Sequence, residues 1–361
     1  MELTAPCYYQ KFQCLAGACR HSCCREGWQI VVDEKTMDFY RSLPAPRREA
    51  ILGCIAQDGE GDWVIQSREG VCPFLTAEGL CQLVISYGDQ GLGEICALHP
   101  RYREWFPGRM EIGVGLCCEE AARLILSDPA PCEFETWITD SEEEDEEPAP
   151  LYPLLVEVRE VLFALLQERE QPLRLRLARC LRLALSLQEA VNRGEDPEEL
   201  AFSRLPGEQR SWQQVLAATL RVHQEMEHLN PEWTAVLEDL DSHQEELDWT
   251  GFERALGQRS YEYEHLAVYL IFRYFLKAVY DKKPLEKVWQ TVVMVLMMAT
   301  LAARRWGEKN DLTLLDQIEV VRLYSSETEY SDENMQLLAE ALLFEPELSA
   351  AGLLGLLEGS D

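Results

Sequence analysis

The organisation of this chain is decided by one short stretch near its start, Cys14-Leu15-Ala16-Gly17-Ala18-Cys19-Arg20-His21-Ser22-Cys23-Cys24-Arg25-Glu26-Gly27-Trp28. Its four cysteines lie close together in the sequence, and Cys23 and Cys24 are adjacent. Thiolates are soft ligands, and four of them suit Zn²⁺ or a [4Fe–4S] cluster. The stretch therefore predicts an irregular region that folds around a fixed centre.

Two further cysteine motifs follow. One comprises Cys72-Pro73-Phe74-Leu75, Cys81 and Cys96-Ala97-Leu98-His99-Pro100-Arg101, and the other is Cys117-Cys118-Glu119-Glu120-Ala121-Ala122-Arg123-Leu124. The spacing matches neither a zinc ribbon with two CxxC knuckles nor the cysteine runs of ferredoxins and radical-SAM enzymes. The pattern favours a metal or Fe–S site, with disulfides or reduced structural cysteines as alternatives. The isolated cysteines are predicted not to be ligands: Cys7, Cys54, Cys132 and Cys180.

The distribution of cysteines also bears on the redox compartment. The chain has 13 cysteines in 361 residues, and only Cys180 lies beyond residue 132. An odd total is a poor match to a small secreted disulfide scaffold. The first residues have neither the basic start nor the apolar segment of a signal peptide. We therefore expect a cytoplasmic protein whose thiols stay reduced, which favours metal ligation over disulfides.

The net charge of −31, from 64 acidic and 33 basic residues, limits the possible partners. A nucleic-acid-binding protein needs a basic face, and anionic membranes repel an acidic protein, so we predict neither partner. The charge permits a partner whose surface carries lysines. The longest apolar stretch, Val288 to Ala303, is shorter than the roughly 20 residues of a membrane span and is predicted to be a buried core helix.

The composition changes near residue 140 and divides the chain. Residues 1–136 are predicted to form a Cys-rich metal-binding region of short strands and helices, and 137–150 an acidic linker closed by two prolines. Residues 151–361 carry apolar residues at three- and four-residue spacing and are predicted to form a multi-helix region. The fold class is therefore mainly α. Helices are expected over 118–126, 154–170, 173–192, 211–229, 232–246, 262–281, 285–306, 312–323 and 332–344.

The cysteine motifs resemble those of a known family. The pattern Phe12-x-Cys14-x4-Cys19-x3-Cys23-Cys24-x2-Gly27-Trp28, together with the motifs at Cys72 and Cys96, is similar to a Cys-rich zinc- or iron-chelating family. With Cys118 to Leu124, the resemblance narrows to the flagellin lysine N-methylases. The distal half supports it: Tyr324 to Asn334 resembles that family's C-terminal motif, and Glu264-His265-Leu266 with Tyr269, Phe272, Arg273 and Tyr274 resembles its central helix.

The chain departs from the family pattern at a few positions. Tyr330 stands where the family usually has His, and His99 stands where it usually has Tyr. Cys117 is an extra residue beside the family cysteine, which corresponds to Cys118. The acidic linker is peculiar to this chain. The replacement at position 330 weakens any catalytic role for that residue.

The resemblance implies methyl transfer from S-adenosylmethionine to lysine ε-amines of flagellin, in an enzyme with an Fe–S cluster. We expect a [4Fe–4S] cluster, with zinc as the alternative. The predicted metal ligands are expected to converge in space from three segments, with Cys14 nearby: Cys14, Cys19, Cys23, Cys24, Cys72, Cys81, Cys96 and Cys118.

Lysine must be neutral to attack a methyl sulfonium, so a carboxylate or Tyr near the amine would help. The candidates are Glu120, Glu327 and Tyr324, followed by Glu119 and Glu329, and each could instead be a surface or capping residue. Arg101 and Arg123 flank cysteine motifs and could bind a carboxylate of the cofactor or balance the charge of a cluster. Each could instead form an intradomain salt bridge.

Two other functions remain open on the sequence. One is a non-catalytic iron- or zinc-binding protein, and the other is an Fe–S redox protein. No glycine-rich nucleotide loop, SET domain or Rossmann methyltransferase is visible. The sequence therefore does not locate a site for S-adenosylmethionine.

Overall fold

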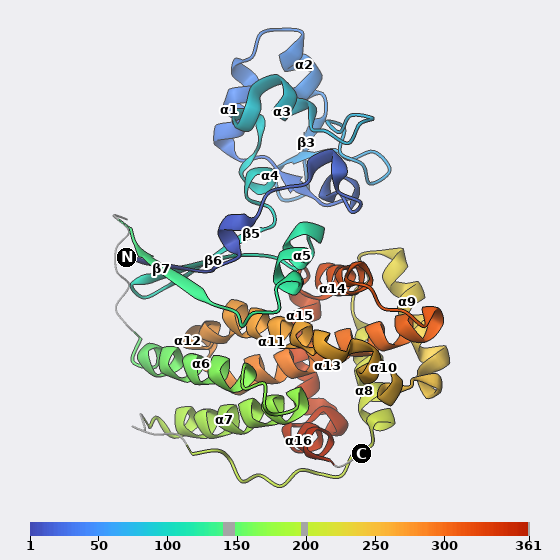
Figure 1. Ribbon diagram of the computed structural model, residues 1–361. Coiled ribbons are helices and arrows are strands. Elements are labelled where there is room, and N and C mark those ends of the chain that lie inside the picture. The colour runs from blue at the N-terminus through green and yellow to red at the C-terminus, as the bar shows by residue number, and fades with distance from the viewer. Residues whose placement is uncertain (140–148, 196–200, 360–361) are drawn as a thin grey trace.

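The computed structural model describes residues 1–139, 149–195 and 201–359 (Figure 1). These residues form three parts that follow one another in space. A Cys-rich lobe, residues 14–98, projects from one end of the molecule. A four-stranded sheet with helix α5 lies below it, and a body of helices packs under the sheet. The predicted linker lies mostly outside the described residues.

The Cys-rich lobe is built from short elements connected by turns. Its helices are α1 (Glu34–Ser42), α2 (Arg47–Leu52), α3 (Gln82–Tyr87) and α4 (Glu94–Leu98). Its antiparallel three-stranded sheet has the strand order β2-β4-β3 and consists of β2 (Ile30–Val31), β3 (Ile55–Gln57) and β4 (Trp63–Ile65). Asp33 caps α1 by accepting from the Thr36 amide, and its second oxygen accepts from the Glu94 amide. Asp33 therefore joins the starts of α1 and α4.

The second sheet joins both ends of the N-terminal region. Its strands, in the order β5-β6-β1-β7, are β5 (Arg101–Phe106), β6 (Arg109–Val114), β1 (Glu2–Pro6) and β7 (Phe134–Ile138). Strand β1 is parallel to β6 and antiparallel to β7, where Leu3 pairs with Trp137. Trp137 and Ile138, which the sequence placed in the acidic linker, are thus the last residues of β7.

The helical body contains eleven α-helices among the described residues. They are α6 (Tyr152–Leu166), α7 (Leu173–Arg193), α8 (Trp212–Glu225), α9 (Pro231–His243), α10 (Trp249–Leu256), α11 (Tyr261–Tyr274), α12 (Ala278–Asp281), α13 (Pro284–Lys309), α14 (Leu314–Thr328), α15 (Asp332–Phe344) and α16 (Ala350–Glu358). The mainly α fold class is confirmed. Helix α13 lies at the centre and contacts α7, α11 and α14.

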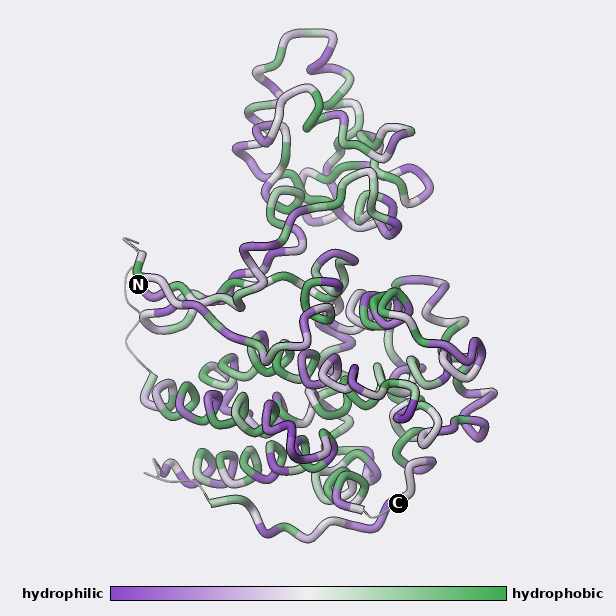
Figure 2. Tube along the Cα trace, in the orientation of Figure 1, coloured by the Kyte–Doolittle hydropathy of each residue, from purple (hydrophilic) through white to green (hydrophobic). Residues whose placement is uncertain are grey.

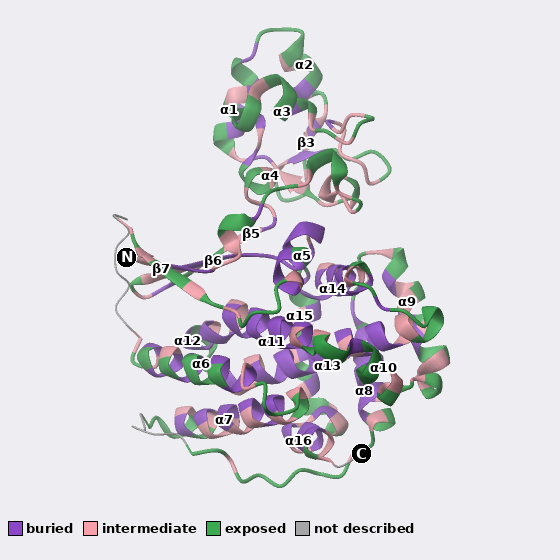
Figure 3. Cartoon of the chain, viewed as in Figure 1, coloured by how far each residue is buried: buried purple, intermediate pink, exposed green. Residues whose placement is uncertain are grey.

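The described residues form three hydrophobic clusters: a large one, a small one in the lobe, and a third of Phe12, Val114, Ala121 and Leu124. The lobe has a small core of its own that includes Met37 and Tyr40. Phe106, Leu116 and Ile125 belong instead to the large core of the helical body. In Figure 3, α5 (Glu119–Ser127) is buried like the helices beneath it, whereas much of the lobe surface is exposed. Residues 1–136 therefore form a lobe and a separate layer that is part of the body.

Apolar residues recur along the helices of the body, whereas the lobe alternates short apolar and polar segments (Figure 2). Among the residues that the structure describes, α13 is the one helix long and apolar enough to cross a membrane by length and composition, and 72% of its most apolar window is buried within the protein. This burial agrees with the core helix predicted over Val288 to Ala303.

Some boundaries differ from the expected ones. The helix expected over 262–281 is interrupted, because α11 ends at Tyr274 and a 3₁₀ turn, Phe275–Lys277, precedes α12. Tyr274, with φ −116° and ψ −28°, is where α11 ends, and its side chain reaches Glu329. The helix expected to end at Leu323 continues to Thr328.

Candidate functional site

The eight predicted metal ligands lie in two neighbouring sets of thiols that meet at Cys23 and Cys24, whose side chains are hydrogen-bonded to each other. Cys19 Sγ lies 3.7 Å from Glu119 Oε2, and Cys118 is the residue that precedes α5. Burial raises the pKa of Cys19 to about 11, and the nearby thiols of Cys118 and Cys14 raise it as well. The same two thiols raise the pKa of Cys23, after the larger effects of the Cys24 hydrogen bond and burial. We call Cys14, Cys19, Cys23 and Cys118 the first thiol group.

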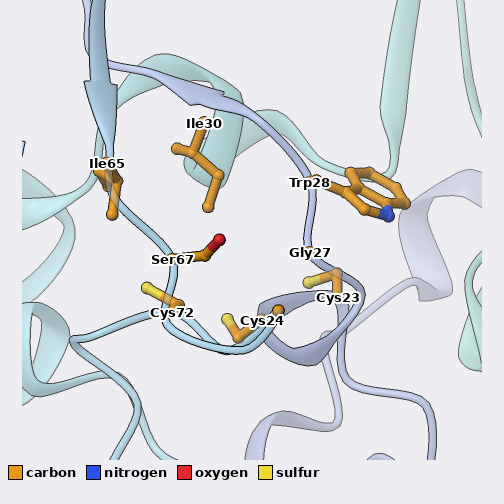
Figure 4. A pocket seen from close by; sticks show the side chains of 9 residues that line it. Cys23, Cys24, Gly27, Trp28, Ile30, Ile65, Ser67 and Cys72 are labelled. Carbon is orange, nitrogen blue, oxygen red and sulfur yellow. The ribbon is translucent and has the colours of Figure 1, made fainter. Parts of the chain in front are cut away.

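The second thiol group consists of Cys24, Cys72, Cys81 and Cys96. The Cys72 amide donates to the Cys24 carbonyl at 2.9 Å, and Cys81 pairs with Leu75 in an isolated β-bridge that folds the chain back towards Cys72. Burial raises the pKa of Cys96 to about 12, and the neighbouring thiols of Cys24, Cys72 and Cys81 raise it as well. Figure 4 shows Cys24 beside Cys72 in a small pocket, with Cys23 on the side of Trp28.

Close backbone contacts hold the cysteine segments together. A Cβ on Gly17 would lie 2.6 Å from the Glu78 carbonyl oxygen, so only glycine allows this approach. Gly27 and Gly70 both have positive φ, and a Cβ on Gly27 would lie 3.5 Å from the Gly70 Cα. The stretch that begins at Cys14 is therefore packed backbone to backbone against the segment that carries Cys72 and Cys81.

The thiols are gathered but not arranged as ligands. All thirteen cysteines are free. Within the three described ranges, no three Cys, His, Asp or Glu side chains are placed so that they could hold one metal ion. The kind and number of donors suit zinc or an Fe–S cluster, whereas the present side-chain orientations do not enclose one. Metal ligation by these eight residues remains a prediction.

Ion pairs attach the first cysteine stretch to the helical body. Glu319 on α14 accepts from Arg20 at 3.0 Å and from His21 at 2.6 Å. Arg20 also forms a 2.8 Å ion pair with Glu119 at the start of α5. One turn further along α14, Arg322 Nη1 lies 3.6 Å from Glu26 Oε1. The stretch from Arg20 to Glu26 therefore lies along one side of α14.

Residues of the two distal motifs meet in a buried polar network. Glu329 accepts from Arg273 at 2.9 Å and from Tyr274 at 2.7 Å, and its second oxygen accepts from Ser325 at 2.6 Å. The Tyr269 hydroxyl also donates to Glu329, at 3.0 Å. Tyr269, Arg273 and Tyr274, more than fifty positions away in the sequence, thus surround the Glu329 carboxylate, and nothing in the sequence apart from the family motifs indicated this pairing.

Three aromatic side chains connect this network to the lobe. The Trp28 ring lies 4.4 Å from that of His99 and 5.4 Å from that of Tyr330, measured between centroids. The Arg273 guanidinium lies 5.6 Å from the Tyr330 ring on the network side. Burial lowers the pKa of His99 to about 4, so this ring is neutral at physiological pH. The two positions that depart from the family pattern, 99 and 330, are therefore neighbours.

The predicted catalytic candidates lie in different places. Glu120 forms two hydrogen bonds with Arg123, at 2.6 and 2.7 Å. Tyr324 is fully buried, and its hydroxyl lies 3.1 Å from His223 Nε2. Glu327 is buried and accepts from the Leu229 amide at 2.8 Å. Burial raises the pKa of Glu327 to about 7, and the negative charge of Glu26 adds to this increase.

Of the other two carboxylate candidates, Glu119 binds Arg20 and Glu329 is the centre of the buried network.

The predicted cofactor-binding arginines do not meet. Arg101 lies over the Phe12 ring at 4.8 Å, and Arg123 is occupied by Glu120. Arg123 therefore forms the intradomain salt bridge that was its alternative, whereas Arg101 contacts an aromatic ring, and the cofactor-binding role of both stays a prediction.

The isolated cysteines lie apart from the thiol groups, with one exception. Cys180 is buried in the large core, and the Cys7 amide donates to Glu133 in the strand layer. Cys54 lies close enough to raise the pKa of Cys72. Cys117, the extra cysteine, is buried beside the Tyr330 hydroxyl, to which it is hydrogen-bonded.

Comparison with known proteins supports the family resemblance that the motifs indicated. The model of the FliB lysine N-methylase C-terminal domain matches residues 159–355, more than half of the chain. A lysine-N-methylase of Salmonella typhimurium is 28% identical over 139 residues, which cover 36% of this chain and 33% of that protein. The flagellar biosynthetic protein FliU of Salmonella muenchen is also 28% identical over 139 residues, which cover 79% of FliU.

The match thus spans about a third of the curated lysine-N-methylases that this chain resembles. No solved structure matches. The matched family region includes α11, α13 and α14, and so contains both halves of the network around Glu329. On this evidence, the chain belongs to the FliB lysine N-methylase family.

Proposed function

We propose that this protein is an S-adenosylmethionine-dependent lysine N-methyltransferase that acts on flagellin and carries an Fe–S cluster. Its relatives are named lysine-N-methylases and a flagellar biosynthetic protein. The observation that carries the proposal is the meeting of Arg273, Glu329 and Tyr330 from the distal motifs with Trp28 from the cysteine stretch. A site assembled from distant segments is typical of catalysis, because function depends on geometry rather than on one motif.

The thiol groups would hold the cluster. When bound, thiolate-ligated iron supplies reversible one-electron chemistry, and it also fixes the segments that provide the ligands. Arg20 and Arg25 lie beside these thiols and would offset part of their negative charge; Arg25 already lowers the pKa of Cys24, after the larger effect of the Cys23 hydrogen bond. The reduced thiols that this requires are those of the cytoplasm, where we place the reaction.

A residue of the chain must accept the proton that the amine loses in each methyl transfer. The amine nitrogen bonds to the methyl carbon while the carbon–sulfur bond of the sulfonium breaks, and the amine loses one proton for each methyl gained. We assign the proton to Glu327, whose pKa of about 7 lets it accept a proton near neutral pH. Glu327 faces Glu26 and Arg322, where the lobe meets the body.

The charge of the protein suits a lysine-bearing substrate. The excess of 31 negative charges attracts a basic surface over distances of about a Debye length, ~8–10 Å in physiological salt. Glu319 is already paired with Arg20 and His21, and Glu119 is already paired with Arg20. Unpaired surface carboxylates elsewhere therefore provide the attraction.

The test is methyl transfer to flagellin by protein purified without oxygen. With S-adenosylmethionine, we expect flagellin peptides whose masses rise in steps of one methylene per transfer. Glu327→Gln should reduce kcat by about 10²–10⁴ while leaving KM within a few fold, the range for loss of a general base. In the wild type, kcat should rise with pH on a limb centred near pH 7, the pKa of Glu327, and Glu327→Gln should lack that limb.

A matched control is Glu160→Gln on the exposed face of α6, which should leave kcat unchanged. Absence of methylation with intact metal and cognate flagellin would reject the enzyme and leave the metal-binding protein. Reversible redox cycling without S-adenosylmethionine would instead favour the redox protein.

A further inference from the structure

We propose that Asn334 is a positioning residue for Glu327. Its side-chain amide holds residues 226–230, which link α8 to α9, in the place from which backbone amides of this link bind the Glu327 carboxylate. The inference deepens the proposed function and rests on its assignment of the amine's proton to Glu327. Asn334 acts through Glu327 and has no part of its own in the proton transfer.

The Asn334 side chain is bonded to backbone groups of two other segments. It lies in the first turn of α15 and is 1% exposed. Its Oδ1 accepts from the Glu227 amide at 2.8 Å, and its Nδ2 donates to the Glu227 carbonyl at 2.8 Å and to the Glu327 carbonyl at 2.7 Å. An asparagine amide offers two donor hydrogens and one acceptor oxygen, so both donors and the acceptor are used. Asn334 therefore ties the link between α8 and α9 to the last turn of α14.

The link that Asn334 holds also binds the Glu327 carboxylate. The Leu229 amide, two residues after Glu227, donates to Glu327 Oε2 at 2.8 Å. The Asn230 amide hydrogen-bonds to the same carboxylate. Because Asn230 is the N-cap of the 13-residue helix α9, the carboxylate lies at the positive end of that helix. The contacts form a closed ring, which runs from Asn334 along the link to the Glu327 side chain and returns from the Glu327 carbonyl to Asn334.

The ring fixes the donors of a buried carboxylate. Burial raises the pKa of Glu327 most, the two amides of the link lower it, Glu26 of the lobe raises it and Arg322 lowers it. If the link moved, the carboxylate would lose its amide donors and its pKa would rise further, because an unpaired charge is costly to bury. The Asn334 backbone is held separately, since its amide donates at 3.1 Å to the Ser331 hydroxyl that caps α15. Loss of the Asn334 side chain should therefore free the link without unfolding the start of α15.

The experiment is the pH profile of kcat for Asn334→Ala, measured with the full chain, S-adenosylmethionine and flagellin. The limb that is centred near pH 7 in the wild type should move to higher pH by about one unit, which is about a tenfold rise in proton affinity. At pH 7 the ionised fraction then falls from about one half to about one tenth, so kcat should drop about fivefold and recover as the pH rises. KM should stay within a few fold. A limb that stays near pH 7 in the folded variant would overturn the proposal.

A second measurement needs no activity and separates failure of this inference from failure of the proposed function. Urea unfolding of Asn334→Ala is compared with that of the double variant that also carries Glu327→Gln. The loss of stability caused by Glu327, which ends near pH 7 in the wild type, should extend to about pH 8. This extension without methylation by any variant would support the role of Asn334 at Glu327 and reject the methyltransferase. Methylation with an unshifted limb and no extension would do the reverse.

Two other variants complete the test. Asn334→Asp has nearly the same shape and keeps the acceptor for the Glu227 amide, but its second oxygen faces the two carbonyl oxygens. It should move the limb in the same direction, and it takes the place of Asn334→Ala if that variant does not fold. Gln336→Ala is the matched control on the exposed face of α15, where Gln336 donates to Glu340 at 2.9 Å. It should leave both the limb and the stability profile unchanged.

Discussion

At the scale of single residues, Glu327 is the side chain whose surroundings most affect its chemistry. Its pKa is raised from 4.5 to about 7, because burial and Glu26 disfavour the carboxylate more than the amide bonds at Leu229 favour it. A carboxyl with a higher pKa in the folded state stabilises the fold when protonated. Stability is therefore lost as pH rises from about 4.5 through 7.

We expect Glu327→Gln to remove this dependence, because the amide cannot titrate and still accepts from Leu229. Relative to the variant, the wild type should lose on the order of 3 kcal/mol of unfolding free energy between pH 5 and pH 8, from about 1.4 kcal/mol per pKa unit. Urea denaturation of both proteins across this range measures the difference. A constant difference at all pH values would contradict the raised pKa.

Single residues also show which parts of the candidate site could be predicted from the sequence. Cysteine spacing predicted the segments that would bind a metal, because ligand chemistry depends on residue type and can be seen without a fold; metal binding by them stays a prediction. The network at Glu329 could not be derived in this way, since Arg273 and Glu329 are ordinary charged residues until α11 and α14 bring them together. Their position within family motifs was the available signal.

At the scale of elements, the capping of α14 controls the helix that carries Glu319, Arg322 and Glu327. Thr313 accepts from the Asp316 amide, and the Asp316 side chain accepts from the Thr313 amide, which forms a capping box. Thr313→Ala should destabilise α14 by about 1 kcal/mol. Hydrogen exchange of the α14 amides should accelerate by roughly fivefold as a result.

The control is Thr250→Ala on the exposed surface of α10, where no cap is lost. It should leave the exchange of α14 amides unchanged. Unaltered α14 protection in Thr313→Ala would show that packing against α5 alone holds the helix.

The elements themselves were largely predictable where they are long and periodic. The three- and four-residue spacing located eight helical stretches of the body, because each buries one face in a common core, whereas α10 and α16 were not predicted. Short elements were less predictable. The brief apolar run at 81–85 forms the start of α3, and the run at 28–32 contains β2, since tertiary contacts rather than periodicity decide such segments.

At the scale of the whole molecule, the two cores differ greatly in size. The core of the lobe has nine buried residues, whereas the body core joins the sheet layer to every long helix. The sequence placed the boundary near residue 140, where the composition changes. In the structure, β1 pairs with β6 and β7, and Phe106 of β5 and Phe134 of β7 pack in the body core, so the pairing of distant segments leaves no local signal at the predicted boundary.

The size difference predicts that the lobe opens before the body. A core of nine residues supplies little stability by itself, so we expect the lobe to depend on the proposed metal ligation and on the contacts of Arg20 and His21 with Glu319. Amides of α1 and α3 should exchange faster than those of α11 and α13 in the native protein. Chelation should accelerate exchange in the lobe by at least tenfold and leave α11 and α13 unchanged, which mass spectrometry of peptic fragments can resolve. Equal acceleration in both parts would mean that they unfold as one unit, and the hydrophobic contacts beneath α5 would then bind the lobe to the body more tightly than its small core suggests.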